Sequence, residues 1–160
     1  MTGSRAYVVT VSDGCWAGTR TDASGPALAD LLRAQGFEIA GSEVVPDERE
    51  RIVDAIMAGV DAGCRLVVTT GGTGLAERDV TPQATSSLLD YEVPGISEEM
   101  RRVGLASTPQ AMLSRSLAGV VQRTLVINLP GSLRGALESL GAVLPVLGHA
   151  MDLLAGDTAH

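Results

Sequence analysis

Apolar residues recur along the chain with two different periods, and segments of each kind follow one another in turn. Segments rich in β-branched residues predict strands, and the continuous apolar run at 65–69 is typical of a strand buried on both faces. Apolar residues at four-residue spacing, such as Ile52, Ile56 and Val60, predict helices. We expect strands at 5–12, 38–45, 65–69 and 124–128, and helices at 24–36, 48–63, 81–89 and 97–103 and from 132 to Gly156, the last in two pieces around Pro145.

Capping and breaking residues suggest where several of these helices begin and end. Ser24 is a candidate N-cap, and Gly36 ends the helix that follows it. Thr81 followed by Pro82 is typical of a cap and a first helical residue. No pattern assigns residues 104–116. Strands separated by helices of this length predict β-α-β crossovers and a mainly parallel sheet, and we expect a single domain over residues 1–160.

Composition excludes several classes of function. The net charge is −7, which argues against a general nucleic-acid surface, and all 12 basic residues are arginine. The lack of lysine excludes a Walker-type phosphate loop and Schiff-base chemistry on lysine. No apolar run approaches the ~18 residues of a membrane span, and no signal peptide is evident, so we expect a cytoplasmic protein. Cys15 and Cys64 are expected to be free thiols, and His149 and His160 do not predict a zinc site.

Polar or glycine-rich turns follow the four predicted strands. These turns are 12–14 (SDG), 46–48 (PDE), 69–74 (TTGGTG) and 128–132 (NLPGS). In an open parallel sheet such turns emerge at one edge, where ligands bind beyond the strand ends. The sequence therefore predicts a ligand site at this edge.

The chemistry of two of these turns suggests a nucleotide with its cation. Glycines at 71–74 would let backbone N–H groups approach a phosphate closely, although they would equally suit a tight strand-to-helix turn. Asp47 and Asp79 beside a phosphate indicate Mg²⁺, which takes one or two carboxylates plus phosphate oxygens. Each aspartate would otherwise act as a helix cap. Arg78 is expected to pair either with a substrate phosphate or with a neighbouring acid.

Seven segments, in this order, are similar to the successive motifs of one enzyme family. The chain resembles the molybdopterin adenylyltransferases of molybdenum-cofactor biosynthesis, the Mog/MoaB-like proteins. The combination of TTGGTG with RDVTP at this distance is the most specific of the matches. The seven segments are VTVSDG, DASGPALADLL, VVPDE, TTGGTGLAERDVTPQAT, MLSRSLAG, LVINLPGS and LGHAMDLLAG.

The resemblance implies a three-layer α/β/α sandwich and an enzyme that transfers AMP from Mg-ATP to the terminal phosphate of molybdopterin, releasing pyrophosphate. It also implies a homotrimer that passes its product to a separate molybdenum-insertion protein. The two essential acids of the family match Asp47 and Asp79, which would hold Mg²⁺ through the phosphates. The substrate-binding positions that match are Ser12, Asp13, Thr70, Gly71, Gly72, Thr73, Gly74, Arg78, Ser114, Arg115, Asn128, Pro130 and Gly131.

Two alternatives to an active adenylyltransferase stay open at this point. Gln83 stands where the family motif usually carries an acid, and MoaB-type relatives keep the binding residues with a less certain transfer role. A molybdopterin-binding carrier with little or no ATP turnover is therefore the first alternative. A different enzyme built on the same domain, such as a molybdenum-insertion protein, is the second, but such enzymes are typically much longer chains.

Overall fold

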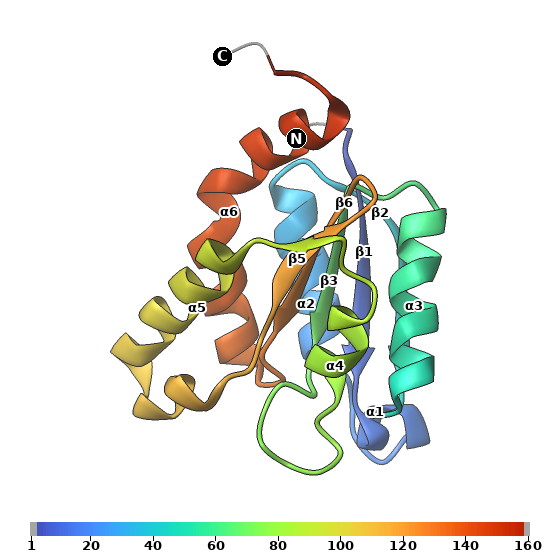
Figure 1. Ribbon diagram of the computed structural model, residues 1–160. Helices are drawn as coiled ribbons and strands as arrows, with labels where there is room; N and C mark the ends of the chain where they lie inside the picture. Colours follow the sequence, from blue (N-terminus) through green and yellow to red (C-terminus); the bar gives the residue numbers. More distant parts are fainter. Residues whose placement is uncertain (1–2, 159–160) are drawn as a thin grey trace.

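A six-stranded sheet forms the middle layer of the protein in the computed structural model, which describes residues 3–158 (Figure 1). The strands, in the spatial order β2-β1-β3-β6-β5-β4, are β1 (Arg5–Val11), β2 (Glu38–Val45), β3 (Leu66–Thr70), β4 (Tyr91–Glu92), β5 (Ala118–Val121) and β6 (Thr124–Leu129). The first four in this order run parallel, whereas β5 and β4 are antiparallel to their neighbours. The predicted mostly parallel α/β sheet is confirmed. His160, at the end of the predicted 1–160 domain, lies outside the described residues.

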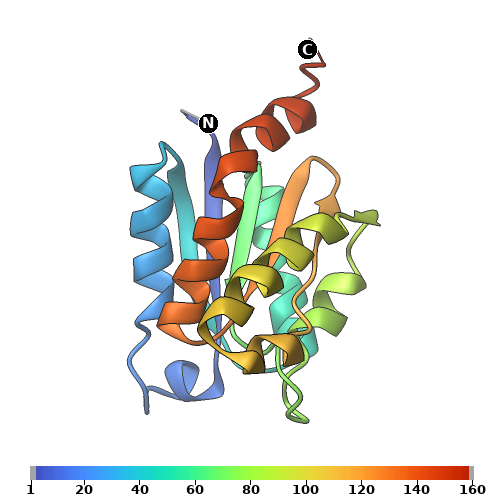
Figure 2. The same ribbon diagram turned by 90° about the vertical axis from the view of Figure 1, so that its left-hand side faces the viewer.

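Helices cover both faces of the sheet (Figures 1 and 2). One face carries α2, α5 and α6, and the other carries α3 and α4. The short α1 and the 3-10 helix η1 lie near the carboxyl ends of the parallel strands. The helices are α1 (Asp13–Ala17), α2 (Ser24–Ala34), α3 (Arg49–Asp61), α4 (Thr81–Ser86), α5 (Pro94–Ser107), η1 (Pro109–Leu113) and α6 (Leu133–Ala155). The three-layer α/β/α sandwich expected from the family resemblance is therefore confirmed.

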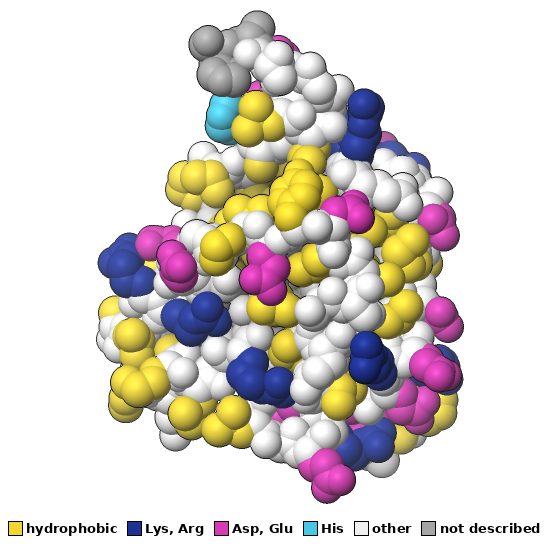
Figure 3. Space-filling view, viewed as in Figure 1, with side chains coloured by type: hydrophobic (Ala, Val, Ile, Leu, Met, Phe, Trp, Pro, Cys, Tyr) yellow, Lys and Arg dark blue, Asp and Glu magenta, His cyan; other side chains and the backbone are white. Residues whose placement is uncertain are grey.

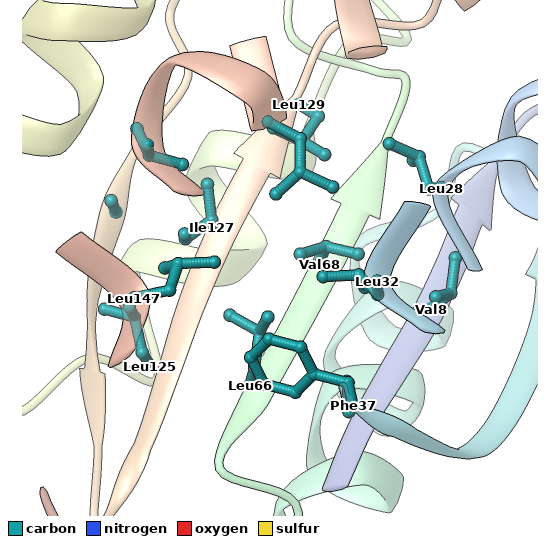
Figure 4. Packing of buried hydrophobic residues seen from close by; sticks show 14 of the residues in the cluster. Val8, Leu28, Leu32, Phe37, Leu66, Val68, Leu125, Ile127, Leu129 and Leu147 are labelled. Carbon is teal, nitrogen blue, oxygen red and sulfur yellow. The ribbon is translucent and has the colours of Figure 1, made fainter. Parts of the chain in front are cut away.

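The central strands send alternate side chains into two hydrophobic cores. Leu66 and Val68 point to the α2–α6 side, where Leu32 packs against them (Figure 4). Val67 belongs to the second core, together with Ile56 of α3. Burying such a side chain contributes about 1.5–3 kcal/mol. Because every residue of β3 is buried, its apolar residues Leu66, Val67 and Val68 follow one another without polar residues between them. The two cores hold the strand ends in place.

Two predicted helix caps were wrong. Ser24 lies inside α2, whose N-cap position is Ala23; the carboxylate of Asp22 accepts the Gly25 N–H at 3.0 Å instead. Thr81 is the first residue of α4, not its cap, and Val80 occupies the N-cap position. In both cases the serine or threonine hydroxyl is used for a tertiary contact, which the local sequence pattern does not encode.

The boundaries of α5 also differ from the prediction. Pro94 begins this helix, three residues before the predicted start at 97, because proline suits a first turn in which N–H groups lack partners; the helix runs to Ser107, past the predicted end at 103. The segment 109–113, which no pattern assigns, forms η1. β4 and β5, of two and four residues, have no counterpart among the predicted strands.

A single continuous helix, α6, replaces the two predicted helical pieces around Pro145. Buried Val143 and Leu147, on either side of the proline, anchor the helix to the sheet, so tertiary packing offsets the lost backbone hydrogen bond. The length of α6 and its mean hydropathy of 1.3 would allow it to cross a membrane. Its buried residues from Ala136 to Met151, however, pack in the core of the domain.

The strand order creates a crevice between β1 and β3. From β1 the chain passes through α2 to β2 on one side, and it then returns through α3 to β3 on the other side of β1. At such a switch point the connections leave in opposite directions, so that a gap opens at the carboxyl ends of the two strands. Asp13 and Gly71 follow the two strands that flank this gap.

Candidate active site

The polar turns that follow β1, β2, β3 and β6 meet at one edge of the sheet, at the lower end in Figure 1. Asp13 and Asp47 bind each other's backbone, since Asp13 N donates to Asp47 Oδ2 and Asp47 N donates to Asp13 Oδ1, both at 2.9 Å. Thr70 Oγ1 donates to the Pro130 carbonyl at 2.7 Å. The first pair joins the turns after β1 and β2, and the second joins those after β3 and β6. The predicted convergence of the four turns is confirmed.

The glycine-rich turn after β3 has a backbone conformation that favours glycine. Gly71 and Gly72 have φ angles of +104° and +69°. A Cβ on Gly71 would collide with the Val11 carbonyl, and one on Gly72 would collide with the Thr81 hydroxyl. Thr81 holds both peptide groups, because its hydroxyl donates to the Gly71 carbonyl at 2.9 Å and its N–H donates to the Gly72 carbonyl at 3.1 Å. The turn is therefore rigid, and it presents bare backbone at the crevice.

Arg115 clamps the loop that carries Asp79. Its Nε donates to the Gly74 carbonyl at 2.8 Å and its Nη2 donates to the Asp79 carbonyl at 2.7 Å. The backbone N–H of Arg115 also donates to the Thr73 carbonyl at 2.9 Å. Because these bonds reach both ends of residues 74–79, Arg115 fixes the position of Asp79 from outside the crevice.

Arg78 forms a bidentate ion pair with Asp13, with Nε–Oδ2 and Nη2–Oδ1 distances of 2.6 and 2.9 Å. Of the two partners left open by the sequence, the structure shows the neighbouring acid. The pKa of the Asp13 carboxyl is lowered, first by the hydrogen bond from Arg78 and then by the one from the Asp47 backbone. Asp13 is thus held as a carboxylate that ties the 74–79 loop to the turn after β1.

Asp47 has the opposite electrostatic environment. Burial is the largest cause that raises the pKa of the Asp47 carboxyl, and repulsion from Asp13 and Asp79 adds to it, while the hydrogen bond from the Asp13 backbone lowers it. An ionised Asp47 beside Asp79 is therefore a site of unfavourable negative charge, which a bound cation would relieve.

The two carboxylates have oxygen atoms available for a cation. Oδ2 of Asp47 accepts the Asp13 N–H, and Oδ2 of Asp79 accepts the Ala76 N–H at 3.0 Å. Within residues 3–158, Oδ1 of each carboxylate has no hydrogen-bond partner. No cluster of three or more His, Cys, Asp or Glu side chains that could enclose a metal occurs in this part of the chain. Two carboxylate oxygens suit Mg²⁺, whose remaining ligands come from phosphate and water.

Two clefts adjoin the glycine-rich turn. The α5–α6 cleft, of about 420 Å³, lies between this turn and the helices α5, η1 and α6. The α1–α2 cleft, of about 530 Å³, lies between the same turn and the segment that joins β1 to α2. Both clefts are lined by Gly72, Asp79, Gly131 and Ser132, so they meet at this point. The arrangement suits two ligands whose ends come together beside Asp79.

The family described as "Probable molybdopterin binding domain" matches residues 7–149, which include all the residues that line the two clefts. The chain belongs to this molybdopterin-binding family. Its membership confirms the resemblance derived from the seven sequence motifs.

Individual relatives agree with this assignment. The molybdopterin adenylyltransferase of Helicobacter pylori (strain J99) is 40% identical over 156 residues, which cover 94% of this chain and 87% of that protein. The gephyrin of Dictyostelium discoideum is 40% identical over 157 residues, which cover 92% of this chain and 22% of that protein. The crystal structure of the molybdopterin biosynthesis enzyme MoaB from Thermus thermophilus has a TM-score of 0.90 and 52% identity, covering 96% of this chain and 97% of that one. The chain spans 22% to 49% of the first four curated relatives that it matches.

In this molybdopterin-binding domain, most of the residues predicted for the site line at least one cleft. Those that do so are Ser12, Asp47, Thr70, Gly71, Gly72, Thr73, Gly74, Asp79, Ser114, Pro130 and Gly131. Asp13, Arg78 and Arg115 instead form the contacts that hold the turns together. Gln83, the departure from the family motif, is exposed on α4 and lines neither cleft.

Asn128 lies away from the clefts, fully buried in the core. Its Nδ2 donates to Thr69 Oγ1 at 3.0 Å and to Thr85 Oγ1 at 2.9 Å, and its Oδ1 accepts the Leu117 N–H at 3.3 Å. These three bonds join β3, α4 and the start of β5. The asparagine that was predicted to bind substrate therefore joins the ends of these elements within the core.

Other cleft residues have no motif that marks them. Arg101 on α5 and Glu138 on α6 line the α5–α6 cleft, and Arg20 lines the α1–α2 cleft. The two helical residues give no sequence signal because helix packing alone brings their polar sides to the cleft. Arg20 had one available signal, its place in the polar segment that follows β1.

Proposed function

We propose that this protein is a molybdopterin adenylyltransferase of molybdenum-cofactor biosynthesis. It would transfer AMP from Mg-ATP to the terminal phosphate of molybdopterin and release pyrophosphate. The observation that carries this proposal is the pair of clefts that meet at Gly72 and Asp79, because a transfer between two bound molecules requires adjoining sites with a common point. The names of relatives such as the Helicobacter pylori enzyme support it.

The chemistry needs positioning and charge neutralisation more than a protein nucleophile. The phosphate of molybdopterin is already ionised near neutral pH, so its oxygen attacks the α-phosphorus of ATP without a strong general base. Backbone N–H groups of the 71–74 turn and the N-terminal end of α6, which begins just after Ser132, favour phosphate at the meeting point. The rigid turn fixes the two anions in line, which lowers the entropic part of the barrier.

Asp47 and Asp79 would hold the magnesium ion of Mg-ATP through the carboxylate oxygens that have no described protein partner. The donor chemistry fits, and a cation there would offset the repulsion that raises the pKa of Asp47. When bound, the ion supplies positive charge against the phosphates. Arg115 and the Arg78–Asp13 pair keep the two carboxylates facing the same point.

Exposed hydrophobic side chains on one face of the molecule support a proposed assembly. Leu105, Met112 and Leu113 are exposed at the end of α5 and in η1, where Figure 3 shows hydrophobic side chains gathered at the lower left. We infer a homotrimer in the cytoplasm, in which such side chains would be covered. A sedimentation experiment would test the trimer. Relatives that carry this domain within longer chains support a separate molybdenum-insertion protein as the recipient of the product.

An AMP-transfer assay tests the proposed activity. Purified protein is incubated with molybdopterin, ATP and Mg²⁺, and the adenylylated pterin is measured by chromatography for the wild type, D79N and E77Q. We expect product from the wild type and a loss of ~100-fold or more for D79N, as for other electrostatic elements of active sites. Glu77 lies in the same loop and is exposed, so E77Q is the matched control. Molybdopterin binding without product would instead indicate a carrier protein.

A further inference from the structure

Arg20 is the only cation that lines the α1–α2 cleft, as far as residues 3–158 show. The charged side chains on that lining are Arg20, Asp22, Asp47 and Asp79. Asp22 is already used, since its Oδ2 accepts Thr10 Oγ1 at 2.7 Å and its Oδ1 accepts the Gly25 N–H at 3.0 Å. The cleft lining thus combines the two acids proposed to hold Mg²⁺ with a single arginine.

The backbone of Arg20 is hydrogen-bonded and its side-chain stem lies over Gly14, whereas its guanidinium makes no described bond. The Arg20 N–H donates to the Gly14 carbonyl at 3.1 Å, and its Cδ would lie only 2.9 Å from a Cβ built on Gly14. The guanidinium has no hydrogen-bond or ion-pair partner among the described residues. Those of Arg78 and Arg115, by contrast, bind Asp13 and the 74–79 loop. Five N–H donors at the edge of a cleft suit phosphate oxygens.

The proposed reaction dictates which phosphates would reach Arg20. A pterin phosphate oxygen forms a bond to the α-phosphorus, the bond from this phosphorus to the bridging oxygen breaks, and the electron pair leaves with pyrophosphate. In an in-line displacement the leaving group lies opposite the nucleophile. If the nucleophile comes from the α5–α6 cleft, past Gly72 and Asp79, pyrophosphate leaves into the α1–α2 cleft.

We infer that Arg20 binds the β- and γ-phosphates of ATP and the pyrophosphate released from it. This inference rests on the proposed adenylyl transfer and assigns the residue that takes the leaving group. The negative charge that develops on pyrophosphate is met by the guanidinium of Arg20 on the cleft lining, so Arg20 acts both in ATP binding and in the transition state.

Calorimetric titration with Mg²⁺ and either inorganic pyrophosphate or AMP tests the inference. Wild type, R20A and R123A are compared. Arg123 is exposed and has no described partner. It lies in the turn before β6, at the end of this strand opposite to the turn 128–132. We expect R20A to bind pyrophosphate about tenfold more weakly, the size expected of a charge-assisted hydrogen bond, with AMP affinity changed by less than about twofold. R123A, which makes the same change in net charge, should match the wild type. Since Arg20 is exposed and its side chain bonds to none of the described residues, R20A should fold.

Other results would overturn the inference. Unchanged pyrophosphate affinity in R20A, or an equal loss of pyrophosphate and AMP affinity, would show that Arg20 does not bind the leaving group. AMP transfer is measured on the same preparations. If the wild type transfers AMP and R20A leaves the pyrophosphate affinity unchanged, the role of Arg20 is overturned but the proposed function is not. Pyrophosphate binding through Arg20 without any transfer overturns the proposed function and leaves Arg20 as a phosphate-binding residue.

Discussion

Replacing Thr81 by valine removes the hydroxyl of this residue but keeps the volume of its side chain, so it tests the hydroxyl alone. Thr81 is fully buried, and its hydroxyl donates to the Gly71 carbonyl at 2.9 Å within a buried contact. Valine keeps the volume but leaves this carbonyl without its donor, which costs about 1–3 kcal/mol of unfolding free energy. For a domain of this size each kcal/mol shifts the Tm by about 2–4 °C, so the Tm should fall by about 2–12 °C.

The same substitution should affect catalysis, because the Gly71 peptide is part of the proposed phosphate cradle. We expect T81V to lower kcat for AMP transfer about tenfold or more, since small displacements of positioning groups have large effects on rate. T81S is the matched control: it keeps the hydroxyl and loses one methyl group, at a cost of about 0.8 kcal/mol. Calorimetry and the transfer assay measure the two effects.

Three results would contradict all or part of this reasoning. If T81V has the Tm and the kcat of the wild type, the hydroxyl does not hold the turn. If T81S loses as much activity as T81V, the methyl group and not the hydrogen bond is responsible. Loss of kcat with an unchanged Tm in T81V would show that the bond serves orientation but contributes no stability.

Three further substitutions test the site and its support. Folding raises the pKa of the Asp47 carboxyl, so the wild type loses stability as the pH rises from the unfolded-state pKa of this carboxyl through its folded-state pKa. D47N should therefore lose AMP transfer yet have a higher Tm than the wild type near pH 7. In calorimetry this Tm difference should vanish once the pH falls below the unfolded-state pKa. N128L should lower the unfolding free energy by about 2–4 kcal/mol in urea titrations, because it leaves the Leu117 N–H and two threonine hydroxyls without a partner. A loss below about 0.5 kcal/mol would show that this buried network does not stabilise the fold. R115K should lower kcat about tenfold with little change in the KM for ATP, because a lysine ammonium cannot replace the two guanidinium N–H groups that hold the 74–79 loop. Hydrogen exchange of residues 74–79 should become faster. A change confined to KM would indicate that Arg115 binds substrate directly.

The local sequence determined the elements of the fold and the chemistry at their ends. The apolar run of β3 and the four-residue spacing in α3 depend on neighbours along the chain, and both were predicted within one or two residues. The left-handed φ angles of Gly71 and Gly72 agree with the glycines placed there. The rule that parallel strands end at one edge was enough to bring the turn with Asp47 and the glycine-rich turn to one site.

Only the tertiary structure decided which candidate polar groups line the clefts and which support the turns around them. Arg78, Arg115 and Asn128 stood among the candidate binding residues, yet their donors are used by Asp13, the 74–79 loop and a buried network. Arg20 carried no motif, but the path of its loop brings it into a cleft. A hydrogen bond depends on distances between segments that are far apart in the sequence, whereas helix and strand periods depend on near neighbours. The sequence therefore predicted the sheet edge at which the two clefts lie, and packing decided which side chains line them.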